Sequence, residues 1–187
     1  MVVQLARRLF TVDDYYRMAA AGILRDDDRV ELIEGEIIQM PPIGSPHASV
    51  VDNLVALFTA QVPAREVRVR IQNPVRLDDR SEPVPDLALL RFRADRYRSG
   101  HPTPTDVLLL VEVSETTLAY DRGIKVPLYA SAGIPEVWIA NIADEVIEIY
   151  RDPDEGAYRS QTQARKGEVV SPALVPDLAL PVAEIFG

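Results

Sequence analysis

Two carboxylates stand at the ends of strand-like segments. Asp86 follows Pro85 at the beginning of the apolar segment 84–90, and Glu112 interrupts the end of the apolar segment 107–113. A buried carboxylate is costly unless it is paired with a partner, so the alternative is a solvated strand end. If the two strands are neighbours, both side chains meet at one point, where a divalent cation would relieve their repulsion. A cation bound there could lower the pKa of its water and stabilise charge on a phosphate.

A lysine follows thirteen residues after Glu112. The chain has eighteen arginines but only two lysines, Lys125 and Lys166. If a helix near 122–132 begins early enough, Asp121, Lys125 and Tyr129 share one face of it. The ammonium could then orient an attacking water or neutralise a phosphoryl transition state. The alternative is a simple helical ion pair between Lys125 and Asp121.

The composition restricts the ligands of any metal. The chain has no cysteine, which excludes disulfides and thiolate ligands, and its only histidines are His47 and His101. A site built from several histidines, as zinc prefers, is therefore not expected. Carboxylate oxygens would have to hold the metal, which favours Mg²⁺ or Mn²⁺.

The net charge of −9 argues against broad electrostatic attraction to nucleic acid. Locally, residues 64–98 hold nine arginines against six acidic residues. This segment predicts either a basic patch or an ordinary solvated surface.

The elements that must position these residues alternate between helix and strand. Thr11 is a predicted N-cap for a helix over 12–21, and Glu34-Gly35 is a predicted hairpin turn between 30–33 and 36–38. Ser45 is the predicted N-cap of the next helix, with Pro46 at its first position. Apolar periodicity extends that helix over 47–61.

The remaining pattern predicts an α/β layer. Segment 107–113 is apolar without alternation, as in a central strand buried on both faces. Pro127 is tolerated only near a first helical turn, so the helix near 122–132 is expected to begin at 122 or later. The other expected strands are 67–71, 84–90, 137–140 and 146–150.

The length of 187 residues and the 47% hydrophobic content predict one domain over 1–187. No run of 18 apolar residues predicts a membrane-spanning helix. Arg7-Arg8 is followed by polar residues rather than by an apolar export core. The expected location is therefore cytoplasmic.

Taken in order, these motifs resemble a known family. Pro85-Asp86, then Glu112-Val113-Ser114, then Lys125 resemble the PD-(D/E)XK nuclease superfamily, and specifically its Uma-two branch of proposed endonucleases. The resemblance covers nearly the whole chain. It includes the runs 31–36 and 133–138 and a histidine, His47, at the beginning of a helix.

The resemblance implies a restriction endonuclease-like α/β fold. Its central mixed β-sheet is flanked by helices, with an N-terminal helix plus hairpin and a C-terminal β-rich extension. It implies Asp86 and Glu112 as metal ligands and Lys125 as the catalytic lysine. The wider superfamily places that lysine two residues after the glutamate, where this chain has Ser114. His47 is expected beside the metal as a base or a phosphate contact.

The function implied is a Mg²⁺- or Mn²⁺-dependent endonuclease that hydrolyses DNA phosphodiester bonds. A homodimer is expected, because two sites related by twofold symmetry cut both strands of a duplex most easily. One alternative is a nuclease-fold module that binds nucleic acid or a protein without efficient catalysis. Another is hydrolysis of a smaller phosphate ester. Glu31, Glu34 and Glu36 are predicted to be surface charge on the hairpin.

Overall fold

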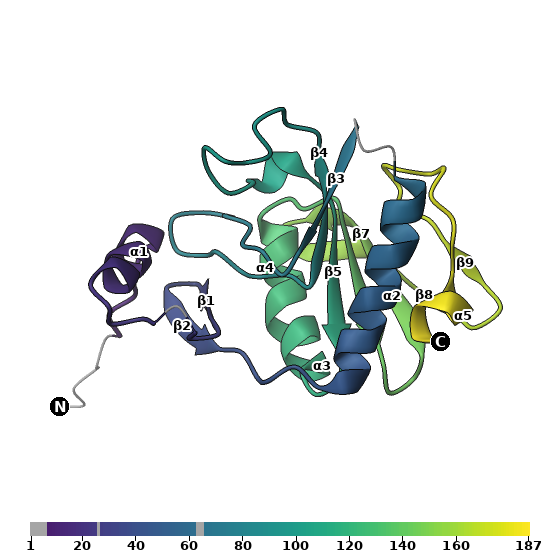
Figure 1. Cartoon of the computed structure of the whole chain (residues 1–187), viewed down its shortest axis with the longest axis horizontal. Helices are drawn as coiled ribbons and strands as arrows, with labels where there is room; N and C mark the ends of the chain where they lie inside the picture. Colours follow the sequence, from purple (N-terminus) through teal and green to yellow (C-terminus); the bar gives the residue numbers. More distant parts are fainter. Residues whose placement is uncertain (1–6, 26, 63–65) are drawn as a thin grey trace.

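A six-stranded mixed β-sheet forms the centre of the fold (Figure 1). The computed structural model describes residues 7–25, 27–62 and 66–187. Only β5 and β6 run parallel, and the other neighbouring pairs are antiparallel. The strands, in sheet order, are β3 (Val67–Ile71), β4 (Leu87–Arg91), β5 (Val107–Ser114), β6 (Glu136–Asn141), β7 (Val146–Asp154) and β8 (Ala157–Arg165).

Helices cover both faces of this sheet, which confirms the predicted fold class. The first face packs against α2 (Ser45–Gln61) and α5 (Val182–Phe186), and the second against α4 (Val126–Ser131). The short helices α3 (Leu118–Tyr120) and η1 (Pro104–Asp106) lie in the connections, and β9 (Val169–Val170) pairs with β10 (Leu180–Pro181). No helix within the described ranges is long and apolar enough to cross a membrane.

Strand β5 is buried along its whole length, as its unbroken apolar sequence predicts. Val111 and Val113 face the core beneath α2, whereas Leu110 faces the core beneath α4. Because hydrophobic layers cover both faces, a carboxylate on β5 is removed from water except at the end of the strand. Glu112 lies near that end.

The predicted N-terminal helix and hairpin are both confirmed. Helix α1 (Val12–Ala20) begins with a capping box between Thr11 and Asp14. Strands β1 (Val30–Ile33) and β2 (Glu36–Gln39) pair antiparallel around Glu34 and Gly35, whose φ angles are 49° and 82°. These left-handed conformations are typical of a two-residue hairpin turn.

Two predicted boundaries were wrong. Gly44, not Ser45, is the N-cap of α2, because Gly44 is extended while Ser45 already lies in the helix. Strand β4 begins at Leu87 rather than at residue 84. Pro85 has no N–H to donate to a ladder, and the Val84 N–H is used by a carboxylate of the hairpin.

The helix that carries Lys125 begins earlier than predicted. A π-helical segment, η2 (Asp121–Lys125), joins α3 to α4, so helical structure extends from residue 118 to residue 131. In an α-helix the Pro127 ring would clash with the carbonyl of Gly123. We attribute the accommodation of Pro127 to the wider π turn that precedes it.

Candidate active site

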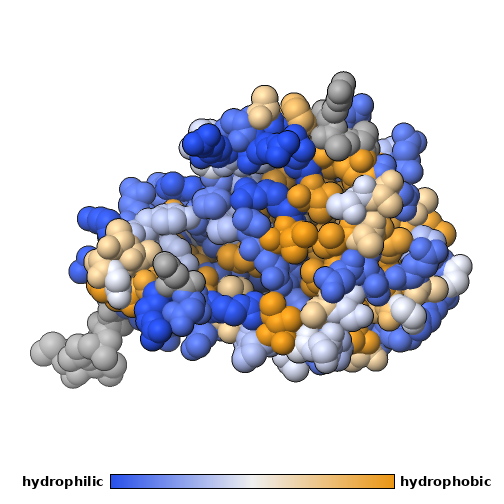
Figure 2. All heavy atoms as spheres, in the orientation of Figure 1, coloured by the Kyte–Doolittle hydropathy of each residue, from blue (hydrophilic) through white to orange (hydrophobic). Residues whose placement is uncertain are grey.

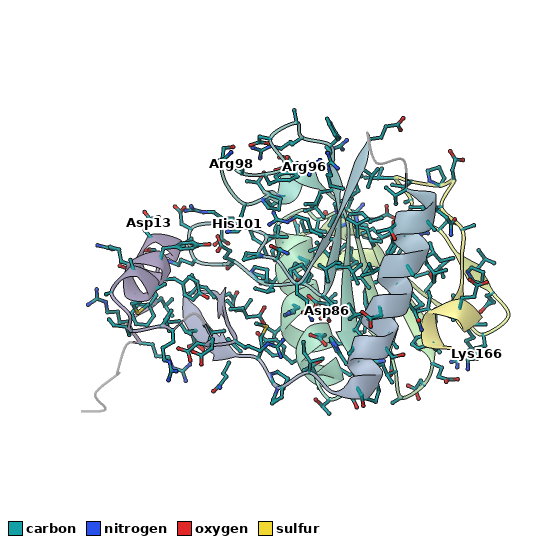
Figure 3. All side chains as sticks on the ribbon, in the orientation of Figure 1. Asp13, Asp86, Arg96, Arg98, His101 and Lys166 are labelled. Carbon is teal, nitrogen blue, oxygen red and sulfur yellow. The ribbon has the colours of Figure 1, made fainter. Side chains whose placement is uncertain are left out.

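The four predicted site residues line one cavity of about 400 Å³. They are Asp86 before β4, Glu112 on β5, Lys125 at the end of η2, and His47 in the first turn of α2. The hairpin β1–β2 and the segment after β2 close the remaining side. Asp86 lies near the middle of the view in Figure 3, between the hairpin and α2.

Asp86 is held by three donors from three elements. Its Oδ2 accepts hydrogen bonds from the Val113 backbone N–H at 2.8 Å and from His47 Nε2 at 3.1 Å. Its Oδ1 accepts a hydrogen bond of 3.2 Å from the Nε2 of Gln72, the residue that follows β3. Burial raises the pKa of Asp86, but these hydrogen bonds and the His47 charge more than offset it and leave the pKa below its usual value.

Glu112 is buried, so a solvated strand end is the wrong account of this residue. Its exposed fraction is 3%, and its Oε1 accepts hydrogen bonds from Tyr129 Oη at 2.5 Å and Lys125 Nζ at 3.3 Å. Burial holds the pKa of Glu112 well above its usual value; Lys125 opposes this shift, whereas neighbouring carboxylates add to it. The cluster therefore favours uptake of positive charge.

Lys125 lies between two carboxylates rather than in a simple helical pair with Asp121. Its Nζ is 3.2 Å from Glu31 Oε2 and 3.3 Å from Glu112 Oε1. Asp121 instead accepts hydrogen bonds from Ser114 Oγ at 2.6 Å and from Thr117 Oγ1. Burial alone would lower the pKa of Lys125, but the carboxylates of Glu112 and Glu31 raise it above its usual value. The amine therefore stays protonated in this setting.

The π turn brings three side chains of one helix toward the end of the sheet. Asp121, Lys125 and Tyr129 are 3%, 5% and 0% exposed, which confirms that they share a buried face. The Val126 N–H bonds to the Asp121 carbonyl, five residues earlier. Arg122 points elsewhere and bonds to Glu148 on β7 through its Nε at 2.9 Å, which ties the turn to the sheet.

Glu31 belongs to this cluster, so its prediction as surface charge was wrong. It is 2% exposed, and its Oε2 also accepts the Val84 N–H at 3.0 Å. Glu34 is exposed and Glu36 is partly exposed, as predicted. A signal for Glu31 was present, because it interrupts an apolar strand as Glu112 does. Its partner Lys125 is 94 positions away and could not be inferred from the hairpin.

One ring nitrogen of His47, Nε2, forms a hydrogen bond with Asp86. Nδ1 is buried and has no hydrogen-bond partner among the described residues. The hydrogen bond to Asp86 raises the pKa of His47, and burial opposes that shift. The Glu115 carboxylate adds further negative charge near the ring.

The donor chemistry of the cavity fits a hard divalent cation. Its lining includes the carboxylates of Glu31, Asp86, Glu112, Glu115 and Asp121 and the basic groups of Arg29, His47 and Lys125. Within the described part of the chain, no group of three or more acidic, histidine or cysteine side chains is arranged so that it could hold a metal ion by itself. Mg²⁺ is commonly held by one or two carboxylates, with water and substrate phosphate completing its coordination, and the cavity offers carboxylates of that kind.

Comparison with known proteins gives consistent results. A family model described as "Uma2: Putative restriction endonuclease" matches residues 12–183. The structure is similar to the crystal structure of "a putative nuclease belonging to DUF820" from Anabaena variabilis ATCC 29413, with a TM-score of 0.72 and 19% identity. That match covers 95% of this chain and 97% of the other. No curated protein matches the sequence.

Proposed function

The chain belongs to the Uma2 family of putative restriction endonucleases, and on this premise we propose that its cavity hydrolyses DNA phosphodiester bonds with a divalent cation. Membership of the family confirms the resemblance noted in the order of Asp86, Glu112 and Lys125. The family and the fold both support a nuclease. The metal, the DNA substrate and the residue roles given below are our proposal.

One observation carries the proposal: Asp86, Glu112, Lys125 and His47 come from four elements and line the same cavity. Asp86 and Glu112 lie next to each other at the end of the β4–β5 ladder, because Leu87 pairs with Val111 in that antiparallel ladder. Sheet pairing therefore brings together two carboxylates that are 26 positions apart. Such convergence is what a cation bound by side-chain oxygens requires.

Asp86 and Glu112 would hold the cation. When bound there, Mg²⁺ or Mn²⁺ would stabilise negative charge on the phosphate and make water a better nucleophile. Lys125, kept protonated by Glu31 and Glu112, would neutralise charge that develops on the phosphate. His47 would orient Asp86 through its Nε2 and add positive charge beside the phosphate when it is protonated.

The test is cleavage of supercoiled plasmid, single-stranded DNA and RNA in Mg²⁺, Mn²⁺ or EDTA. The variants are Asp86→Asn and Lys125→Ala. The chain supplies a matched control for each. Asp177 repeats the Val-Pro-Asp-Leu-Ala-Leu context of Asp86 on the exposed surface, and Lys166 is the only other lysine. We expect metal-dependent cutting by the wild type, Asp177→Asn and Lys166→Ala, and at least a roughly 100-fold loss in both site variants.

A second candidate is a nuclease-fold module that binds DNA without cutting it. The ion pairs of Lys125 favour it, because an ammonium between Glu31 and Glu112 already has partners. DNA binding by the wild type without cutting in any metal would select this candidate. Cutting by all variants alike would identify a contaminating nuclease and remove support for the site.

We also propose that residues 1–187 act as one domain and that the protein is a homodimer. Two copies would present two cavities to the two strands of a duplex. Light scattering that gives the mass of a single 20.8 kDa chain at assay concentrations would contradict the dimer.

A further inference from the structure

An arginine-rich face lies beside the cavity, on the edge strand β3 and on the loop that follows β4. We define the arginine face as Arg68, Arg70, Arg93, Arg96 and Arg98. Figure 2 shows hydrophilic surface over the loop after β4, at the upper left of the view. Arg96 and Arg98 are labelled there in Figure 3, above Asp86. Arg65, the remaining arginine near β3, lies outside the described residues.

Aromatic rings hold part of the face in place. The Arg68 guanidinium lies 4.8 Å from the centroid of the Phe92 ring, and Arg93 lies 4.5 Å from that of Tyr97. Arg70 approaches the Tyr97 ring from 5.9 Å. Stacking fixes a guanidinium without consuming its charge, so less conformational freedom remains to be lost when an anion binds.

Carboxylates in the structure leave most of this charge uncompensated. Of the five arginines of the face, only Arg93 forms an ion pair within the described ranges, with Asp95 at 2.8 Å. Segments 66–72 and 87–105 contain six arginines and two acidic residues, in a chain whose net charge is −9. On a protein with a net negative charge, a polyanion is expected to bind at a positive face, because the rest of the surface repels it.

The end of β3 connects the face to Asp86, which lines the cavity. Arg70 Nη2 donates to Asn73 Oδ1 at 2.9 Å, and the neighbouring residue Gln72 donates to Asp86. Arg68 and Arg70 are two residues apart on one strand, which is about 6.6 Å. Phosphates two steps apart along one DNA strand are separated by an axial rise of about 6.8 Å, twice the rise of about 3.4 Å per step. The strand that carries these two arginines therefore ends beside Asp86, a proposed metal ligand.

We propose that the arginine face binds the phosphate backbone of the DNA whose bond lies in the cavity. This inference rests on the proposed function for its substrate, but it concerns binding rather than cutting. It accounts for how an acidic chain attracts DNA at all. The contacts are to phosphates, so they give affinity and orientation without sequence preference.

The test is fluorescence anisotropy of a labelled duplex of about two helical turns in EDTA, where metal-dependent cutting cannot occur. The face variants are Arg68→Gln with Arg70→Gln, and Arg96→Gln with Arg98→Gln. The matched control is Arg159→Gln with Arg165→Gln on β8, the opposite edge of the same sheet. Thermal denaturation shows whether each variant is folded. If the substitutions at the half-buried Arg68 and Arg70 destabilise the protein, the variant at the exposed Arg96 and Arg98 still tests the inference.

Removing one arginine–phosphate pair should weaken binding about 5-fold at about 0.15 M salt, so each double variant should bind roughly 30-fold more weakly. The slope of log Kd against log salt should fall by about 2. The β8 control should match the wild type. Equal affinity of folded face variants and wild type would overturn the inference, as would a wild type that does not bind the duplex. Equal competition by poly-glutamate and DNA would overturn it too.

These outcomes separate the inference from the proposed nuclease. If the wild type cuts plasmid and the face variants bind and cut normally, the nuclease stands and the arginine face is wrong. If the wild type binds through the face but never cuts, the face stands and the nuclease is wrong.

Discussion

Replacing Lys125 by methionine tests the buried charge cluster directly, whatever the protein does. The ammonium is 5% exposed and lies 3.2 Å and 3.3 Å from two carboxylates, those of Glu31 and Glu112. With an effective dielectric constant of about 20, each pair contributes about 5 kcal/mol of attraction. Burying the ammonium costs several kcal/mol in return. Removing one partner of such a cluster is expected to cost about 3–5 kcal/mol, because the carboxylates left behind remain buried.

The assay is thermal denaturation in EDTA. For a chain of this size each kcal/mol lowers Tm by about 2–4 °C, so Lys125→Met should melt roughly 6–20 °C below the wild type. Adding Glu31→Gln should restore part of the loss, because it removes one unpaired carboxylate while the amide oxygen can still accept the Val84 N–H. The double variant should therefore be more stable than Lys125→Met alone.

Lys166→Met is the control, since Lys166 is exposed and pairs only at the surface with Glu145. It should melt within about 2 °C of the wild type. If Lys125→Met also melts within that range, the cluster is not buried as described. If Glu31→Gln lowers the stability of the Lys125→Met protein further, the two side chains do not share one electrostatic site, and the reasoning fails.

Two further predictions concern the scaffold. Gly35→Ala should destabilise the protein by at least about 2 kcal/mol, because φ is 82° and the new Cβ would lie 2.7 Å from Leu9 Cβ. Chemical denaturation measures this loss. Arg122→Gln should remove stability that depends on pH. Burial raises the pKa of Glu148, but the Arg122 hydrogen bond holds it below its usual value of 4.5, so the Arg122 contribution is present above that pH and is lost on acidification. The gap between wild type and Arg122→Gln in denaturation midpoints should therefore be largest near pH of about 7 and shrink below pH of about 4.

Each scaffold prediction has its own control. Gly133 also has a positive φ, of 74°, but nothing lies within 4 Å of its added Cβ, so Gly133→Ala should cost only about 1 kcal/mol. Equal losses at both glycines would show that the Leu9 contact does not matter. A gap between wild type and Arg122→Gln that stays constant across the acidic range would show that Arg122 acts through packing rather than through Glu148.

Local patterns were sufficient to predict most of the fold. The capping box at Thr11, the Glu34-Gly35 turn and the apolar segment of β5 each encode their structure in neighbouring residues. The beginning of the Lys125 helix was missed because a π turn has no simple apolar period, and Pro127 indicated a later start. The start of β4 also depends on a distant hydrogen bond, from the Val84 N–H to Glu31, which the local sequence does not encode.

The candidate site was partly predictable for the same reason. Asp86 and Glu112 were found because each carboxylate stands near one end of an apolar segment, and strand pairing places the two ends together. The roles of Glu31 and Tyr129 depend on docking the hairpin and helix against the sheet, which brings residues from distant parts of the chain into contact. Such contacts follow from tertiary packing, and a single sequence gives no direct sign of them.

The position of β3 at the edge of the sheet also bears on solubility. An edge strand offers unpaired backbone groups to any other strand, and charged side chains on it prevent such pairing. Arg68 and Arg70 alternate with Val67, Val69 and Ile71, a sequence that would otherwise favour aggregation. Two copies that meet through this edge would bring like charges together, so a homodimer should use another surface. At physiological ionic strength this repulsion decays over a Debye length of about 8 Å, and the length shortens as salt is added. Aggregation of the purified protein should therefore increase as the salt concentration is raised.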